Sequence, residues 1–147
     1  MVSWPVCGDV YLVDFEYHPV NGVEGNLPDP VCMVVLNLKS GTIDRYFREQ
    51  LRSLEEAPFD TGPDSLWIAF YAPAEMDCFI QLGWSLPDNV LDIFVEFRNL
   101  TNGLTLRHGN SLLGAMAYYG LTSMGPTEKD AMRDLILSRG PWSEKQE

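Results

Sequence analysis

The chain lacks the features that mark membrane, secreted and repeat proteins. None of its apolar runs approaches the ~20 residues that a membrane-spanning helix needs. Its first residues show no basic region followed by an apolar stretch, so no signal peptide is indicated. Internal repeats and low-complexity segments are also absent. We therefore expect the 147 residues to form a single domain with one core, located in the cytoplasm and not in a membrane.

Cysteine is scarce and unpaired in the sequence. The three cysteines, Cys7, Cys32 and Cys78, are odd in number, lie far apart and form no Cys-x-x-Cys pair. Neither a disulfide framework nor a zinc site is indicated. A reducing setting fits this pattern.

Basic residues are also few. Ten Lys and Arg stand against 21 Asp and Glu, which gives a net charge of −11. This balance opposes tight, nonspecific binding of nucleic acid, because such binding depends on many phosphate contacts. It does not oppose a nuclease that holds one strand end through metal ions.

The most informative segment that is present is an apolar strand that ends in two acids, over residues 10–16. Side chains alternate along a strand, so Asp14 and Glu16 share the face of Leu12, and Phe15 lies on the opposite face. Two carboxylates about 4 Å apart repel by roughly 4 kcal/mol at an effective dielectric near 20. A divalent cation with oxygen ligands, Mg²⁺ or Mn²⁺, would relieve this repulsion. The alternative is a solvated strand end without a ligand.

Hydrophobic patterns and boundary signals predict the remaining elements. Further strands are expected over 31–38, 43–48 and 66–71, with a strand or a strand-to-helix stretch over 90–97. Helices are expected over 49–57, over 74–82, between 111 and Gly120, and from Thr127 to about 139. The first three strands form a meander, and strands and helices then alternate. This order predicts an α/β fold with a mixed sheet.

The helix expected over 74–82 carries two acids, and its geometry distinguishes them. At about 100° per residue, Glu75 falls within the apolar arc of the helix, whereas Asp77 lies beside Gln81 on the polar side. We expect Glu75 to project towards the sheet and Asp77 towards water. An acid on a polar face at a helix N-terminus needs no further explanation, because the helix dipole favours it. Glu75 is therefore the preferred site residue, and Asp77 is the alternative.

These motifs, in this order, resemble the 3′–5′ exonuclease domain of the DEDD superfamily. More narrowly, the chain is similar to the proofreading domain of some phage and bacterial family A DNA polymerases. Asp14-Phe15-Glu16 matches the first motif, Asp-x-Glu, and Glu75 stands where the second motif usually has Asp. Residues 91–94 resemble the Asp-bearing strand that follows. Residues 111–121 resemble the helix that ends in a Tyr-Gly turn.

The resemblance implies a ribonuclease H-like fold, in which helices flank a five-stranded mixed sheet whose first three strands are antiparallel. It also implies two Mg²⁺ or Mn²⁺ ions, held by Asp14, Glu16 and Glu75, that hydrolyse phosphodiester bonds at the 3′ end of single-stranded DNA. Phe15 and Tyr17 are candidate aromatics for stacking on bases. A polymerase domain following this chain is the implied partner.

One family motif is missing. The third motif, Tyr-x-x-x-Asp or His-x-x-x-x-Asp, has no match in the chain. We therefore expect residues 1–147 to lack the last helix of the domain and to be weakly active or inactive alone. A non-catalytic ribonuclease H-like scaffold or protein-interaction module is the main alternative. An acidic mimic of nucleic acid is disfavoured, because the key acids interrupt apolar segments.

Two further charged features favour structural roles. For Asp92, a role as a turn or cap acid is preferred to a role as a metal ligand. A solvated face is the preferred interpretation of Arg45, Arg48 and Arg52, and phosphate binding is the alternative.

Overall fold

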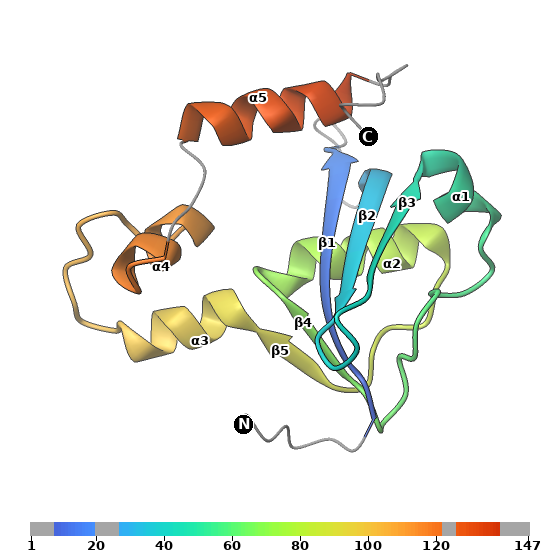
Figure 1. Ribbon diagram of the computed structural model, residues 1–147, viewed down its shortest axis with the longest axis horizontal. Coiled ribbons are helices and arrows are strands. Elements are labelled where there is room, and N and C mark those ends of the chain that lie inside the picture. Colours follow the sequence, from blue (N-terminus) through green and yellow to red (C-terminus); the bar gives the residue numbers. More distant parts are fainter. Residues whose placement is uncertain (1–7, 20–26, 122–125, 139–147) are drawn as a thin grey trace.

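Five strands form one mixed sheet in the order β3-β2-β1-β4-β5 (Figure 1). The computed structural model describes residues 8–19, 27–121 and 126–138. The elements are β1 (Val10–His18), β2 (Asp29–Asn37), β3 (Ile43–Phe47), α1 (Arg48–Ser53), β4 (Leu66–Ala69), α2 (Ala72–Leu82), β5 (Val90–Asp92), α3 (Ile93–Leu100), α4 (Leu112–Tyr118) and α5 (Pro126–Leu137).

The strand directions confirm the predicted sheet. β1 and β2 are antiparallel, as are β2 and β3, whereas β4 pairs parallel to both β1 and β5. β4 is short and pairs only with Val10 to Leu12 of the nine-residue β1. The second half of β1, which carries Asp14 and Glu16, therefore extends beyond the end of β4.

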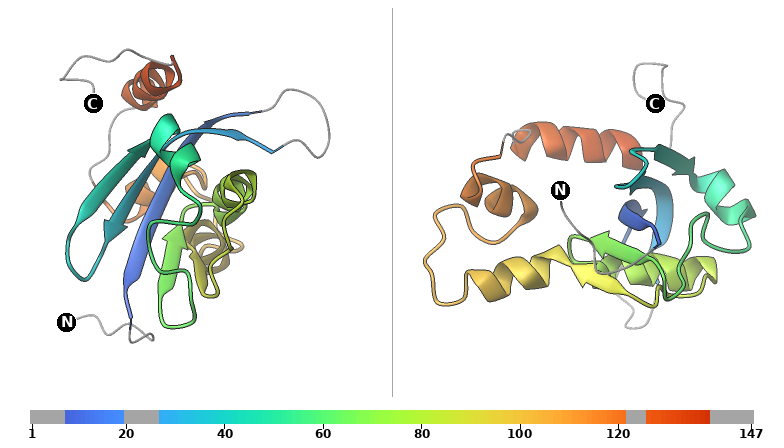
Figure 2. Two further views of the ribbon diagram at one scale, coloured as in Figure 1. Left: turned by 90° about the vertical axis from the view of Figure 1, so that its right-hand side faces the viewer. Right: turned by 60° about the horizontal axis from the view of Figure 1, so that its bottom comes forward.

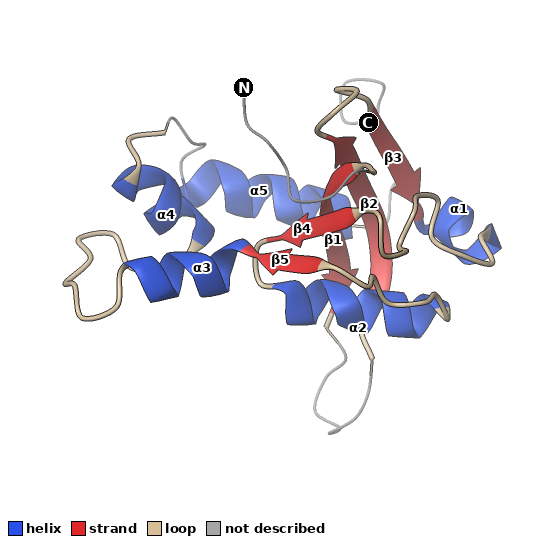
Figure 3. Cartoon of the chain, turned by 90° about the horizontal axis from the view of Figure 1, so that it is seen from below, coloured by secondary structure: helices blue, strands red, loops and turns tan. Residues whose placement is uncertain are grey.

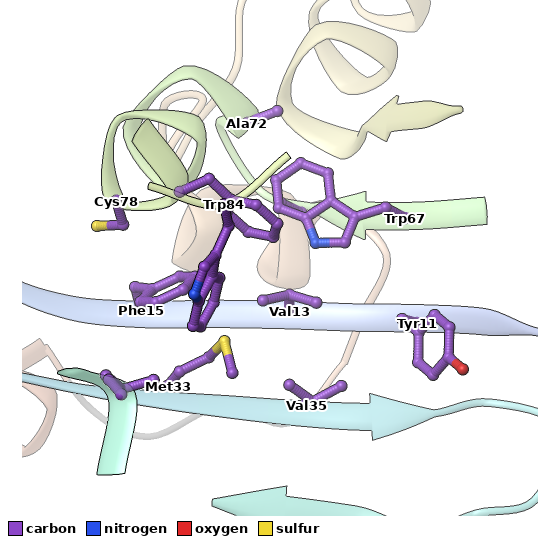
Figure 4. Packing of buried hydrophobic residues seen from close by; sticks show 12 residues of the cluster. Tyr11, Val13, Phe15, Met33, Val35, Trp67, Ala72, Cys78 and Trp84 are labelled. Carbon is purple, nitrogen blue, oxygen red and sulfur yellow. The ribbon is translucent and has the colours of Figure 1, made fainter. Parts of the chain in front are cut away.

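The main core lies between the sheet and α2 (Figure 4). Tyr11, Val13 and Phe15 of β1 are all buried on this face, as the alternation predicts. The ring of Phe79 of α2 is fully buried and lies 5.6 Å from that of Trp67, between ring centroids, in an edge-to-face arrangement. Alternation along β1 and the buried Phe79 of α2 thus account for much of this layer.

The opposite face of the sheet has a smaller apolar cluster. Val10, Leu66 and Ile68 are buried there, with Leu12 and Leu91 packed against them. α5 contacts β1 and β2 and lies near the carboxyl end of β1 (Figures 1 and 2). Asp14 and Glu16 belong to this face. The acids of β1 are thus placed between the end of the sheet and α5.

Local signals explain most boundaries. α2 has proline in its first turn and ends at Gly83, whose φ of 75° is easily adopted by glycine. The side chain of Ser111 accepts a hydrogen bond from the Gly114 N–H and begins α4. The stretch expected over 90–97 is a strand followed by a helix, β5 and α3.

Several predicted boundaries are displaced by one to four residues. β4 ends at Ala69, two residues before the predicted end, because the chain turns there into α2, which begins at Ala72 instead of at 74. α1 covers 48–53, and α5 begins at Pro126. The predicted end of the last helix near residue 139 lies outside the described residues. None of the described helices is long and apolar enough to cross a membrane.

Candidate active site

The acids of β1 lie where the strand has passed its parallel neighbour. Asp14 is exposed, and the side chain of Glu16 is 24% exposed. Both project from the face of the sheet opposite to Phe15, because side chains alternate along the strand. The part of β1 that carries these two carboxylates therefore extends beyond its pairing with β4.

Glu75 reaches the same region from the first turn of α2. Its side chain is 5% exposed, and its Oε2 accepts a hydrogen bond of 2.9 Å from the Phe15 N–H. In a longer parallel pair, a carbonyl of β4 would accept this hydrogen bond. Because β4 ends at Ala69, the carboxyl group takes the place of that carbonyl. A backbone group of β1 thus fixes the side chain of Glu75 at this strand, within electrostatic reach of the two strand acids.

The three acids share one electrostatic environment. Burial raises the pKa of Glu75 to about 9, and the charge of Asp14 adds to this effect. The Phe15 N–H opposes the shift, and Glu16 adds to it less than Asp14 does. The carboxyl of Glu75 therefore holds a proton at neutral pH unless a cation compensates the charge.

The predicted orientations of the two acids of α2 are confirmed. Glu75 is buried, whereas Asp77 is exposed. The buried face of the helix also contains Cys78 and Phe79, while Ile80 is 48% exposed. The inward face is therefore rotated away from Ile80, and Glu75 lies well within it.

The donor chemistry of these residues fits a divalent cation. All three are carboxylates, and the like charges that raise the pKa of Glu75 are those that a hard cation neutralises. Cys32 lies opposite Glu16 on β2, and burial and the charge of Glu16 raise its pKa to about 11. Sulfur is a soft donor, which a hard cation does not prefer. Within the described segments, however, no three acidic, histidine or cysteine side chains converge into a metal-binding group. The acids form an anionic cluster, not a closed ligand cage.

Arg133 of α5 contacts one of these acids. The Nε of Arg133 lies 3.4 Å from Oε2 of Glu16. The sequence pattern did not single out Arg133, because no local spacing relates the last helix to the first strand.

A pocket of about 300 Å³ lies beside the cluster. Tyr17, Tyr71 and Pro73 contribute to its walls, and Ala74, the neighbour of Glu75, also lines it. Burial raises the pKa of Tyr17, and the charge of Glu75 adds to this shift, so the phenol lies within electrostatic reach of the carboxylates. Two tyrosines therefore flank an open space next to the acids.

The expectation that Phe15 offers a ring for base stacking is wrong. Its side chain is 3% exposed and packs edge-on against Phe79, with ring centroids 5.9 Å apart. Alternation along β1 places Phe15 in the main core. Tyr17, next in line on that face, is only partly buried and lies at the pocket.

The turn that precedes Glu75 is strained and held by Asp92. Tyr71 has a φ of 72°, a left-handed conformation that is unusual for a residue other than glycine. The carboxylate of Asp92 accepts hydrogen bonds from the N–H groups of Tyr71 and Ala72, at 3.1 and 3.0 Å. It also accepts hydrogen bonds from Phe94 and Val95 as the N-cap of α3. The predicted cap role of Asp92 is confirmed, and its hold on the Tyr71 turn is additional.

The arginines near β3 serve a structural contact. Arg48 and Arg52 both form ion pairs with Asp29, which joins α1 to β2. Arg52 is 55% exposed, in agreement with the predicted solvated face, whereas the Arg48 side chain is only 20% exposed and serves the contact with Asp29.

A comparison with solved structures finds the same architecture in a nuclease. The chain aligns with Trypanosoma brucei RNase D, whose crystal structure is a complex with RNA U12, at a TM-score of 0.62 and 16% sequence identity. The fold is ribonuclease H-like. The alignment covers 92% of this chain but only 48% of the RNase D chain, so this chain spans about half the length of that structure.

The likeness is one of fold. At 16% identity it shows the ribonuclease H-like fold alone and does not reach the narrower resemblance to polymerase proofreading domains. No family model matches the sequence, and no curated protein matches it either.

Proposed function

We propose that this chain is a metal-dependent 3′–5′ exonuclease domain that removes nucleotides from the 3′ end of single-stranded DNA. The observation that carries the proposal is the buried Glu75 of α2, bonded to the backbone of β1 and electrostatically coupled to its two acids, on a fold shared with a nuclease. A buried carboxyl with two like charges close by is costly, and such perturbed groups concentrate at functional sites.

The proposal assigns metal binding to three residues. Asp14, Glu16 and Glu75 would hold the divalent cations, and Glu75 would lose its proton on doing so. When bound, Mg²⁺ or Mn²⁺ supplies Lewis-acid stabilisation of the phosphate and of the leaving 3′ oxygen. The Phe15 N–H holds one oxygen of the Glu75 carboxylate, which leaves the other oxygen for a cation. Further ligands would have to come from outside the described residues.

The pocket beside the cluster suits a nucleobase. Tyr17 and Tyr71 line it together with the acid Asp77, and stacking of bases on aromatic rings is tolerant of sequence. The narrower resemblance favours a DNA end and a polymerase partner, whereas the RNase D structure contains RNA. Both kinds of strand therefore belong in the assay.

The first experiment tests metal binding. Mn²⁺ at a hundredfold excess over its Kd should raise the Tm of the wild-type chain by roughly 5–10 °C, because a ligand that binds only the folded state stabilises it. Asp14→Ala should remove most of this rise and should itself stabilise the metal-free protein by removing a like charge. Asp88→Ala, an exposed acid remote from the motifs, is the control. A wild-type Tm that does not respond to Mn²⁺ contradicts the proposal.

The second experiment tests cleavage. Single-stranded DNA and RNA oligonucleotides with a 5′ fluorophore are incubated with the chain and Mn²⁺, and shortening from the 3′ end is followed on a gel. Shortening by the wild type that Glu16→Ala abolishes, in protein purified identically, supports the exonuclease. Equal shortening by both proteins identifies a contaminating nuclease.

A second candidate function has one observation in its favour. No three ligands converge within the described residues, which suits a non-catalytic module of the same fold. Such a module would show no Asp14-dependent Mn²⁺ effect and no cleavage of either oligonucleotide. The two experiments therefore separate the candidates.

A further inference from the structure

Arg133 of α5 is a cation that lies against the carboxylates of β1. Its Nε faces Glu16 at 3.4 Å, and its charge also reaches Tyr17, where it lowers a pKa that burial and Glu75 raise. Arg133 is therefore close both to an acid of the proposed metal site and to the pocket beside it. The guanidinium of an arginine in this position can pair either with a carboxylate of the chain or with a phosphate of the substrate.

The ion pair with Glu16 is loose. A charge-assisted hydrogen bond between N and O is normally 2.7–2.9 Å long, whereas this pair is at 3.4 Å, with 47% of the Arg133 side chain exposed. The pair between Arg48 and Asp29 is shorter, at 2.5 Å, and the Arg48 side chain is only 20% exposed. Exposed pairs of this kind contribute little to folding. Arg133 can therefore leave Glu16 without unfolding α5.

We propose that Arg133 is a phosphate-binding residue of this site. Its guanidinium pairs with Glu16 while no divalent cation is bound. Once a cation occupies the carboxylates, the Arg133 side chain moves and its guanidinium pairs with a nucleotide phosphate. This inference rests on the proposed function and names the side chain that binds the phosphate of the substrate.

The chemistry of the guanidinium supports this exchange. Its planar fork of N–H donors matches two phosphate oxygens, and half of the side chain is open to solvent beyond the contact with Glu16. A chain with a net charge of −11 also needs a local cation where a polyanion approaches its acids. A nucleotide bound there would have its phosphate at Arg133 and its base within reach of Tyr17.

The exchange predicts opposite effects on two ligands. Arg133 competes with a divalent cation for Glu16, so its removal should strengthen Mn²⁺ binding. Arg133 assists a phosphate, so its removal should weaken nucleotide binding. An arginine with a purely structural role would not separate the two affinities in this way.

The experiment compares Arg133→Gln and Arg133→Lys with the wild type, and Arg107→Gln serves as a control. Arg107→Gln makes the same charge change at an exposed position between α3 and α4. The Kd for Mn²⁺ comes from Tm titrations, and the Kd for thymidine 5′-monophosphate comes from calorimetry with Mn²⁺ present. Neither measurement requires turnover.

Arg133→Gln should bind Mn²⁺ a few-fold more tightly and thymidine 5′-monophosphate about tenfold more weakly, because it loses a charge-assisted contact. Arg133→Lys should keep the wild-type Mn²⁺ affinity and recover part of the nucleotide affinity, since lysine keeps the charge but not the fork. Arg107→Gln should match the wild type in both.

Two results would overturn the inference in different ways. Unchanged nucleotide affinity in Arg133→Gln, with Asp14-dependent Mn²⁺ binding intact, reduces the pair to a surface contact and leaves the proposed function standing. Absence of Asp14-dependent Mn²⁺ binding in the wild type overturns both. The Tm of metal-free Arg133→Gln should stay close to that of the wild type, which confirms that the variant is folded.

Discussion

At the scale of single residues, Glu75 shows how this site balances opposing forces. The hydrogen bond from Phe15 N–H favours the carboxylate, whereas burial and the charges of Asp14 and Glu16 favour the protonated acid. Burial and the like charges outweigh the hydrogen bond and raise the pKa of Glu75 to about 9. A buried apolar side chain would avoid this cost, so the acid is retained at the expense of folding stability.

This balance predicts how stability depends on pH. Because the pKa of Glu75 is about 9 when folded and near 4.5 when unfolded, the folded state binds more protons between these values. Metal-free stability should therefore fall as pH rises through that window. Glu75→Gln keeps an oxygen for the Phe15 N–H and has no charge to bury. Its advantage over the wild type should grow with pH, by at most roughly 1.4 kcal/mol per unit.

Urea denaturation with EDTA at pH 5 and pH 8 measures this effect. The stability difference between Glu75→Gln and the wild type should be small at pH 5 and clearly positive at pH 8. Glu96→Gln makes the same chemical change on the exposed side of α3 and should show no such trend. A difference for Glu75→Gln that is the same at both pH values would show that the acid is not perturbed.

At the scale of elements, the carboxylate of Asp92 joins two turns. It caps α3 and also holds the Tyr71 turn, from which α2 carries Glu75 to β1. The left-handed Tyr71 persists because its N–H and that of Ala72 have a fixed acceptor. β5 is only three residues long and pairs with β4 over few residues. The contacts of Asp92 therefore add to the link between the start of α2 and the start of α3.

Removal of this carboxylate should therefore loosen the α2 turn. We expect Asp92→Ala to lower the free energy of unfolding by about 2 kcal/mol, the cost of a lost helix cap together with weakened turn contacts. Asp92→Asn keeps one acceptor oxygen and should cost less. Asp88→Ala, an exposed acid four residues earlier, serves as the control and should change stability little. Urea denaturation at pH 7 measures all three, and equal stability of Asp92→Ala and the wild type would contradict the assignment.

At the scale of the whole molecule, the chain divides into a well-packed sheet layer and a more open helical side (Figure 3). Trp67 and Phe79 are almost fully buried between the sheet and α2. By contrast, large apolar side chains in and around α3 and α4 stay exposed: Leu100 at 62%, Leu104 at 56%, Tyr119 at 55% and Leu121 at 58%. Free energy of folding is therefore concentrated at the sheet.

Native-state hydrogen exchange should reveal this division. Amides of β1 and β2 should exchange only at free energies near that of global unfolding, whereas those of α3 and α4 should open at distinctly lower values. Phe79→Ala, which costs about 3–5 kcal/mol in a packed core, should lower protection throughout. Ile80→Ala, on the exposed side of the same helix, should not. Uniform protection of strands and helices in the wild type would contradict this description.

Much of the site follows from periodicity. Alternation along β1 places Asp14 and Glu16 opposite Phe15, and the helical repeat of α2 turns Glu75 inward and Asp77 outward. The same alternation argues against Phe15 as a stacking ring, because it belongs to the buried face. Asp92 was expected as a cap, but its contacts with the Tyr71 turn join residues about 20 positions apart, which no local rule connects.

The sequence by itself determined which side chains share a face, where helices begin and end to within a few residues, and which acid points inward. These properties depend on the geometry of one strand or one helix, and each is set by neighbours within a few positions. Only the tertiary structure decided that Glu75 would meet the Phe15 N–H, 60 residues away, and that Arg133 would face Glu16. Such contacts depend on where β4 ends and how α5 packs, and these are set by the packing of the whole chain.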